Sequence, residues 1–526
     1  MSQPPLIQAL LKREAFPHPC AEVRLIETHI SWVLLTGKYA YKIKKPLDLG
    51  FLDYSTLALR KHFCEKEVQL NRHYTSQVYL EVVPLYGTET DPEFSSTGPV
   101  IEYAVKMREF PQEQLLNERL KNGSASLKLI LKSAACLAQS HLHSMHCPPE
   151  EGFGSSAQIT EPVQQNFSQI SPLLKNNADH LQLQHLEKLT LSKLAEISHL
   201  IEERKQQGFV RACHGDAHLG NIAIVDEEPI FFDCIEFNDS FRWTDVMADL
   251  GFLIMDLESK GYNEFAAHTL NEYLQITGDY SGLAVLDFYK TYRATVRAKV
   301  MLFQMQQTES PTEKQTLLEK YRHAIALATE FLTKEYPSIV ITQGVCGSGK
   351  TTLATILAGK MSKIYLSSDR ERKRSNGLEP DQQAVSPVNQ DFYSHEMHQK
   401  TYQHLLQLTQ QILNYDYSVI IDASFIKLAH RQQFQLLAER CHCPLAILQL
   451  QANSETIKQR LHDRLDSTDK SSDAYLDVLE MQLATVDPLT EEELAQTISV
   501  DMNNYQIDDL ISDLQALLTR WDKNNN

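Results

Sequence analysis

Eight residues in the second half of the chain have the types and spacing of a phosphate-binding loop. Residues 344–351 read GVCGSGKT and fit the pattern G-x-x-x-x-G-K-[ST]. Glycines at these positions let consecutive backbone N–H groups point into one concavity, and a following helix adds the positive end of its dipole. Lys350 would reach the β- and γ-phosphates, and the hydroxyl of Thr351 would coordinate magnesium. The loop therefore predicts a site for ATP with Mg²⁺.

The surroundings of the loop support this prediction. Residues 338–342 form a short apolar run that indicates a buried strand, and residues 352–358 begin an apolar helix. This strand–loop–helix context is the one that a phosphate-binding loop requires. The residues expected to contact the nucleotide are Gly344, Gly347, Ser348, Gly349, Lys350, Thr351 and Thr352.

A second set of polar residues lies in the first half of the chain. Phosphoryl transfer to a hydroxyl needs a carboxylate near the attacking oxygen and further groups that hold Mg²⁺ on the nucleotide. Asp216, Asn221 and Asp233 supply such a set. Two short apolar strands, 222–225 and 229–232, joined by an acidic turn, would place Asn221 and Asp233 at neighbouring strand ends. Both side chains could then face one metal ion.

The pattern His214-x-Asp216-x4-Asn221, followed by Asp233, resembles the aminoglycoside and choline phosphotransferase family, a branch of the protein-kinase-like fold. The resemblance covers roughly residues 20–330. It implies that Asp216 is the catalytic base and that Asn221 and Asp233 bind Mg²⁺.

A kinase-like site also needs a strand lysine on the nucleotide phosphates and a helix glutamate that holds this lysine. The strand that ends at Lys44 offers Lys42 or Lys44, which share one face, and the next helix offers Glu67 or Glu65. We choose the pair Lys42 and Glu67. No G-x-G-x-x-G motif precedes the lysine, because only Gly37 marks the hairpin before it.

The second half alternates short apolar runs with helical patterns, which predicts a parallel sheet covered on both faces. Its ligand would lie at the carboxyl ends of the strands, where Asp369 and Asp422 follow two of the runs. The runs are 364–368, 417–421 and 444–450, and the helical stretches are 395–413, 427–440 and 454–465.

Residues 338–526 resemble the small P-loop kinases, among them gluconate- and nucleoside-kinase-like enzymes, zeta toxins and the kinase domain of phage polynucleotide kinases. The resemblance implies that Asp369 activates the acceptor hydroxyl and that Arg372 holds the substrate. It also implies that Asp422 is the carboxylate behind the water shell of Mg²⁺.

A lid should bring arginines over the transferring phosphate, because the charge there must be neutralised while water is excluded. Arg460 and Arg464 are four residues apart, so they share one face of the predicted helix. We expect both to contact the nucleotide.

The composition limits the classes of partner. Lys and Arg number 50 against 68 Asp and Glu, a formal net charge of -18, which argues against nonspecific duplex binding and against docking on anionic membranes. The basic run 370–374 has no aromatic residues among it, so we do not expect nucleic acid as the acceptor. The nine cysteines include no C-x-x-C pair, and we find no leader and no apolar run of membrane-spanning length. We therefore expect a soluble cytoplasmic protein.

Taken together, these patterns predict two domains. Residues 1–335 would form an α+β protein-kinase-like bilobal domain, with a small lobe at about 1–110 and a helical lobe at about 111–335. Residues 336–526 would form an α/β P-loop domain. Each domain would bind Mg-ATP and transfer phosphate to a hydroxyl of a small-molecule acceptor. The missing glycine loop leaves one alternative, in which the first domain senses ATP and regulates a P-loop kinase or ATPase.

Overall fold

The computed structural model describes residues 3–50, 52–94, 98–148, 150–333, 336–378, 395–466 and 479–525. The chain divides into two compact units. Unit 1 comprises Met1–Asp256 and Phe288–Ala328, and unit 2 comprises Leu257–Asp287 and Thr329–Asn526. Residues 257–287 fall inside the range predicted as kinase-like, yet they pack within unit 2. The sequence prediction contained no such excursion.

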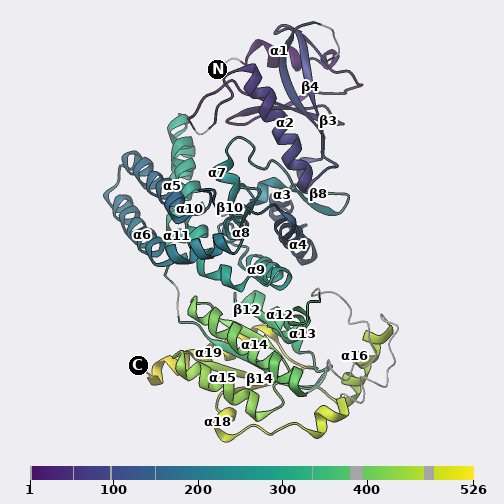
Figure 1. The fold of residues 1–526 in the computed structure, drawn as a ribbon, viewed down its shortest axis with the longest axis vertical. Coiled ribbons are helices and arrows are strands. Elements are labelled where there is room, and N and C mark those ends of the chain that lie inside the picture. Colours follow the sequence, from purple (N-terminus) through teal and green to yellow (C-terminus); the bar gives the residue numbers. More distant parts are fainter. Residues whose placement is uncertain are drawn as a thin grey trace. The chain divides into compact units, whose positions relative to one another are not determined.

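The small lobe of unit 1 is an antiparallel sheet in the order β1-β2-β3-β6-β4-β5, with helix α2 (Leu57–Tyr74) beside it (Figure 1). The predicted hairpin of two strands with Lys42 and Lys44 is confirmed as the β2–β3 pair. Apolar residues of α2, among them Cys64 and Val68, pack on Val105 and Tyr79 of the sheet. The strands are β1 (Arg24–Glu27), β2 (Ser31–Leu35), β3 (Tyr39–Lys44), β4 (Tyr79–Thr88), β5 (Asp91–Glu93) and β6 (Val100–Arg108).

The rest of unit 1 is mostly helical (Figure 1). The last part of the predicted helical lobe is two helices, because Pro311 begins a new helix at which Ser310 Oγ accepts a hydrogen bond from the backbone N–H of Glu313. The main helices of this part are α3 (Leu116–Lys121), α4 (Leu127–His143), α5 (Ser156–Ile170), α6 (Asn177–Gln206), α7 (Asp239–Arg242), α8 (Val246–Glu258), α10 (Leu283–Gln307) and α11 (Pro311–Phe331), and the last residues of α8 and the first of α10 belong to unit 2.

Two small strand pairs interrupt the helices of unit 1. Strand β7 (Val210–Ala212) pairs with β10 (Trp243–Asp245), and β8 (Ile222–Val225) pairs with β9 (Glu228–Phe231). The acidic turn between β8 and β9 has two consecutive residues with positive φ, which matches the twist of a tight hairpin. The predicted hairpin that brings residues 221 and 232 together is therefore confirmed.

Unit 2 is built on a five-stranded sheet in the order β12-β13-β11-β14-β15, and every pairing is parallel. One face packs against α12 (Lys350–Lys360) and α19 (Ile507–Asn525), and α14 (His395–Asn414) and α15 (Leu428–Arg440) lie side by side on the other (Figure 1). The predicted parallel sheet with helices on both faces is confirmed. Its strands are β11 (Ile339–Gln343), β12 (Ile364–Ser367), β13 (Val419–Asp422), β14 (Leu445–Gln451) and β15 (Thr497–Asp501).

Helix α9 (Asn263–Thr277) completes the edge of this sheet. Asn271 accepts a hydrogen bond from the backbone N–H of Tyr365 at 2.8 Å and donates one to the carbonyl of Lys363 at 2.9 Å. Gln275 donates to the carbonyl of Tyr365 at 2.7 Å. These side-chain amides satisfy the edge of β12 as a neighbouring strand would.

Two further observations concern the whole chain. All nine cysteines are free. Among the helices of the described residues, none has both the length and the apolar composition that a membrane span requires.

Candidate active sites

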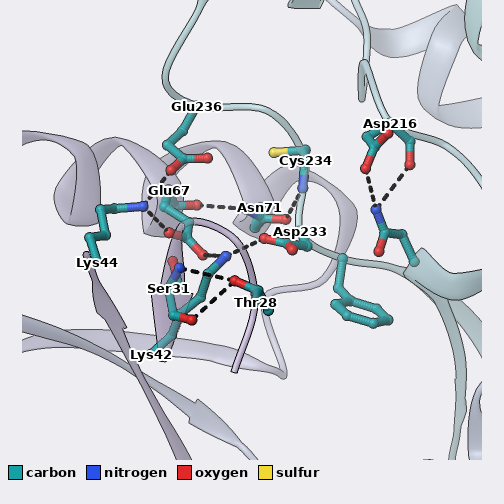
Figure 2. Close-up of polar contacts among 12 residues, drawn as sticks. Thr28, Ser31, Lys42, Lys44, Glu67, Asn71, Asp216, Asp233, Cys234 and Glu236 are labelled. Atoms are coloured by element: carbon teal, nitrogen blue, oxygen red, sulfur yellow. Dashed lines mark hydrogen bonds and ion pairs between the residues drawn. The ribbon is translucent and has the colours of Figure 1, made fainter. Parts of the chain in front are cut away.

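A buried network of ionised side chains lies between the small lobe of unit 1 and the loop after β9 (Figure 2). Lys42 donates to Glu67 Oε1 at 2.8 Å and also pairs with Asp233. Burial by itself would lower the pKa of Lys42, but the charges of Asp233 and Glu67 raise it well above its usual value. In the same way, burial raises the pKa of Glu67 while Lys42 and Lys44 lower it to about 2. Lys42 and Glu67 are therefore both charged at neutral pH.

Lys44 shares the network but faces other partners. It donates to Glu67 Oε2 at 2.6 Å and to Tyr54 at 3.3 Å, and it pairs with Glu236. Lys42, by contrast, contacts Asp233 and lines a cavity at the lobe junction. This arrangement favours Lys42 over Lys44 as the lysine that meets a nucleotide. The alternative carboxylate, Glu65, is exposed and pairs with Lys61.

Asp216 lies in a loop that holds its carboxylate in place. Asn221 Nδ2 donates to Asp216 Oδ2 at 2.9 Å and to its carbonyl at 3.0 Å (Figure 2). His218 Nδ1 accepts the N–H of Gly220, so Nε2 holds the ring proton and points it at Asp216 Oδ2, 3.5 Å away. Burial raises the pKa of Asp216, but His218, Arg293 and His214 lower it to about 2. Since 38% of the side chain is exposed, this ionised carboxylate can be reached by an acceptor.

His214 connects this loop to the loop of Asp233. Its Nδ1 accepts the backbone N–H of Asp216 at 3.3 Å, and its Nε2 donates to the carbonyl of Phe232 at 3.0 Å. Burial lowers the pKa of His214, which keeps the ring neutral and able to do both. Asp249 on α8 accepts the backbone N–H groups of His214 and Gly215 at 2.6 and 2.9 Å. The buried carboxylate of Asp249 thus stabilises the conformation of this loop.

Asp233 has a left-handed backbone with φ of 61°, which a non-glycine residue adopts only when neighbours enforce it. Tyr79 accepts its N–H at 3.0 Å, and Asn71 accepts the N–H of Cys234 at 3.0 Å. The carbonyl of Asn221 accepts the N–H of Phe232 at 3.0 Å, so the predicted metal ligands Asn221 and Asp233 are anchored at adjacent strand ends. An amide oxygen and a carboxylate are ligands that Mg²⁺ accepts.

A cavity of about 260 Å³ lies next to this cluster. Its lining combines Lys42 and Asp233 with apolar residues, namely Val33, Leu35, Ala40, Val78, Met107 and Phe232. The hairpin turn above it offers little for a phosphate, because the N–H of Gly37 already donates to Glu109 Oε2 at 2.7 Å. In unit 1 a nucleotide would therefore be held by side chains.

The phosphate-binding loop of unit 2 is formed by main-chain groups. Gly347 and Gly349 have positive φ angles of 77° and 98°, and α12 begins directly after the loop, at Lys350. The Nζ of Lys350 lies over the loop and donates to the carbonyl of Val345 at 2.7 Å. Such a nest of N–H groups at a helix N-terminus fits a polyphosphate.

The predicted magnesium ligands of unit 2 lie together. Thr351 Oγ1 donates to Asp422 Oδ2 at 2.7 Å, and the hydroxyl of Tyr365 donates to the same oxygen at 2.8 Å. Asp422 ends β13, next to β11 that precedes the loop. These hydroxyl and carboxylate oxygens suit Mg²⁺. Thr352 follows in the first turn of α12 and is exposed.

Asp369 lies in the first turn of α13 (Ser368–Ser375), after β12. Arg372 donates to it at 2.5 Å and Lys373 lies 3.0 Å from it, so two cations of the same helix orient the carboxylate. Arg460 on α16 (Ser454–Asp466) reaches the loop, where it donates to the carbonyl of Ser348 at 3.3 Å. Arg464 lies in the same helix, but its side chain is outside the described residues.

Sequence analysis did not predict several residues that shape these sites. The motif includes His214 but gives it no role. Asp249, Tyr79 and Asn71 lie far in the sequence from the motifs that they support. Their roles depend on tertiary contacts. No local pattern could have revealed them.

Each site brings together the kinds of group predicted for a kinase: a lysine, oxygen atoms of the types that bind Mg²⁺, and an aspartate. Residues 59–289 match the model of the phosphotransferase enzyme family, and residues 339–489 match the model of the AAA domain. The chain therefore joins a kinase-like phosphotransferase fold to a P-loop domain, and it is an ATP-dependent kinase. The predicted fold class and the two resemblances are confirmed.

Relatives extend over both units. Uncharacterized proteins of Mycobacterium tuberculosis and Mycobacterium bovis are each 28% identical to this chain over 456 residues, which cover 84% of this chain and 86% of each relative. An alignment of this length exceeds either unit, so these proteins are similar to the chain in both.

Solved structures match one part of the chain at a time. A choline/ethanolamine kinase family protein from Mesorhizobium loti is 12% identical, with 62% of this chain and 95% of that chain covered and a TM-score of 0.38. A gluconokinase from Sinorhizobium meliloti is 20% identical, with 36% of this chain and 97% of that chain covered and a TM-score of 0.26.

Proposed function

We propose that the chain transfers the γ-phosphoryl group of Mg-ATP to hydroxyl groups of small-molecule acceptors at two sites, one in each unit. The observation that supports this most directly is the ionised, accessible Asp216, held by Asn221 next to the network of Lys42, Glu67 and Asp233.

In unit 1, Asp216 would orient the acceptor hydroxyl and take its proton as the new O–P bond forms. A carboxylate with a pKa of about 2 is a weak base, so orientation is its larger contribution. Lys42 would move from Asp233 to the phosphates. Asn221 and Asp233 would hold Mg²⁺, which supplies neutralisation of the phosphate charge.

In unit 2, the loop amides and Lys350 would hold the phosphates, and Thr351 with Asp422 would hold Mg²⁺. Asp369 would take the proton of the acceptor hydroxyl, with Arg372 contacting the substrate. Arg460 would add positive charge over the transferring phosphate, and we predict the same role for Arg464.

The test is transfer from γ-labelled ATP to a small-molecule extract by the full chain and by the variants Asp216→Asn and Asp369→Asn. We expect each variant to lose a different set of labelled products and each unit to bind one nucleotide. Intact labelling in both variants would contradict the proposal.

One observation favours the alternative that unit 1 senses ATP and regulates unit 2. The hairpin amide that could grip a phosphate, at Gly37, is occupied by Glu109. In that case Asp216→Asn would remove no labelled product, and a nucleotide bound in unit 1 would change the turnover of unit 2. Labelled products that depend on Asp216 would exclude this alternative.

A further inference from the structure

Two arginines lie near the loop that carries Asp216. Arg293 and Arg297, both on α10, lie beside the ring of Phe252 on α8, with their guanidinium carbons 4.8 and 5.2 Å from the ring centroid. The same ring lies 5.4 Å from the ring of His218, the residue that points its proton at Asp216. Two positive charges thus surround one aromatic ring that touches the catalytic loop.

These arginines have hydrogen-bond donors to spare. Arg293 forms no ion pair with any residue that the structure describes, and its buried Nε has no hydrogen-bond partner there. Arg297 has Asp256 at 3.9 Å, but this carboxylate already accepts the backbone N–H of Leu219 at 3.0 Å. Asp249, the other buried carboxylate nearby, is occupied by two backbone N–H groups. Neither carboxylate accepts a hydrogen bond from Arg293, so its Nε donor stays without a partner among the residues that the structure describes.

A partly buried guanidinium N–H group without an acceptor is costly unless a ligand supplies one. The planar forks of both arginines match carboxylates and phosphates, which arginine binds through two parallel hydrogen bonds. Contact with Phe252 limits the freedom of both side chains before any ligand arrives. An anionic group on the acceptor would offer the hydrogen-bond acceptors that Arg293 lacks.

We propose that the acceptor of unit 1 is an alcohol that also carries an anionic group, either a carboxylate or a phosphate, bound by Arg293 and Arg297. The inference depends on the proposed kinase activity of unit 1. The anion accepts hydrogen bonds from the two arginines while the hydroxyl faces Asp216. The acceptor oxygen then bonds to the γ-phosphorus, the bond to the bridging oxygen of ADP breaks, and the hydroxyl proton passes to Asp216.

The experiment separates a small-molecule cell extract by charge at pH 7 into anionic, neutral and cationic fractions. The full chain is incubated with each fraction and γ-labelled ATP, and labelling by Asp216→Asn is subtracted so that only products of unit 1 remain. We expect these products in the anionic fraction. Phosphatase treatment of that fraction before the assay distinguishes the two sources of charge, because it abolishes labelling of phosphate-bearing acceptors and spares carboxylates.

Variants then test the arginines on the acceptor found. Arg293→Gln and the double variant Arg293→Gln/Arg297→Gln should raise the KM for that acceptor at least about tenfold and leave the KM for ATP unchanged. Arg322→Gln is the matched control, because this arginine of α11 pairs with Asp179 and lies outside the site. Thermal unfolding of each variant shows whether it is folded.

The outcomes separate this inference from the proposed function. Products in the neutral or cationic fraction would overturn the inference and leave the kinase activity standing. Equal loss of kcat for all acceptors in Arg293→Gln, with unchanged KM values, would also overturn it, because the arginine would then act on the transferring phosphate. If no fraction gave products that depend on Asp216, the kinase activity of unit 1 would fall, and this inference with it.

Discussion

The two candidate nucleotide sites of this chain hold their charges with different parts of the polypeptide. In unit 1 the groups are side chains, with Lys42, Glu67 and Asp233 packed into one ion network. In unit 2 they are main-chain amides of residues 344–351, with one lysine above them. The first arrangement must balance its charges within the protein when no ligand is present. The second would bind phosphate mainly through main-chain N–H groups, and it depends on a backbone that only glycine adopts easily.

The largest difference should appear when the phosphate lysine of each site is replaced. Lys42→Met leaves Glu67 and Asp233 without a shared cation, and breaking such a buried pair costs about 3–5 kcal/mol. Lys350→Met removes a hydrogen bond to the carbonyl of Val345, the loss of which costs about 1 kcal/mol. Denaturant unfolding of the full chain, with hydrogen exchange to assign each transition to a unit, measures both.

A second variant checks the reason for that difference. Adding Glu67→Gln to Lys42→Met removes one of the unbalanced carboxylates, so the free energy of unfolding should recover in part. Lys44 keeps Glu236 as its partner in this double variant. Equal destabilisation by Lys42→Met and Lys350→Met would contradict the comparison between a charge-balanced site and a main-chain site.

Glycine substitutions test whether the main chain binds phosphate in unit 2 but not in unit 1. An added Cβ at Gly349 would lie 2.8 Å from Met502 Cε and 3.2 Å from Arg460, at a φ of 98°. Gly349→Ala should therefore weaken nucleotide binding to unit 2 by about 2 kcal/mol, roughly 30-fold. A Cβ at Gly37 would meet nothing within 4 Å, although φ is 86°. Gly37→Ala should cost unit 1 some stability and change its nucleotide affinity less than about fivefold.

Titration with a fluorescent ATP analogue measures both glycine variants. Each is combined with a substitution that silences the other site, Lys350→Met with Gly37→Ala and Asp233→Asn with Gly349→Ala. An equal loss of affinity at both sites would mean that the hairpin of unit 1 also grips phosphate with its backbone.

The two units also differ in what completes them, because unit 2 takes helix α9 from a distant part of the sequence. Gln275→Ala should lower the free energy of unfolding of unit 2 by about 1–2 kcal/mol, since the carbonyl of Tyr365 loses its donor. Asn271→Ala should cost at least as much, because it leaves one N–H and one carbonyl of β12 without partners. The exposed Gln315, whose side chain pairs with Glu319, is a control expected to have no effect.

Stability of residues 336–526 alone offers a further check on α9. That fragment contains the whole sheet but lacks the helix that satisfies its edge, so it should unfold at a lower denaturant concentration than unit 2 in the full chain. An unchanged midpoint would show that contacts with α9 do not stabilise the sheet.

The sequence predicted what is encoded locally. The phosphate-binding loop, the β8–β9 hairpin and the alternation that gives a parallel sheet all depend on residues within one or two elements. Strand β15 was not expected, because residues 497–501 mix polar and apolar types without a buried run. The placement of α9 was not expected either. Its pattern is that of any amphipathic helix, and nothing in it tells which unit it covers.

The site residues show the same division. Lys42, Glu67 and Asp233 were expected to act together, and the structure brings them into contact. Their roles in binding phosphate and Mg²⁺ stay predictions. The contact between Arg293 and the ring of Phe252 joins two helices at positions about forty residues apart in the sequence, and it follows no motif. Such contacts exist only once the helices are packed.

The smallest expected effect concerns pH, and it again separates a side-chain site from a main-chain site. Burial raises the pKa of Asp216 and His218 is the strongest influence that lowers it, with about 2 as the result, so His218→Asn should move this pKa upward. Wild-type Asp216 is ionised throughout pH 4–8. In the variant the acid limb of kcat/KM for unit 1 should move up by about one pH unit or less, from about pH 2 towards pH 3, because the carboxylate is 38% exposed. The sign for stability agrees: the lowered pKa of Asp216 stabilises the folded chain above pH 3.8, and this contribution disappears as the pH falls towards 2.

The control is His143→Asn, which replaces an exposed histidine of α4 and should leave the pH profile of unit 1 unchanged. The pH profile of unit 2 should be unchanged in both variants. An acid limb that stays in place in His218→Asn would mean that Arg293 and His214 keep the pKa of Asp216 low without His218.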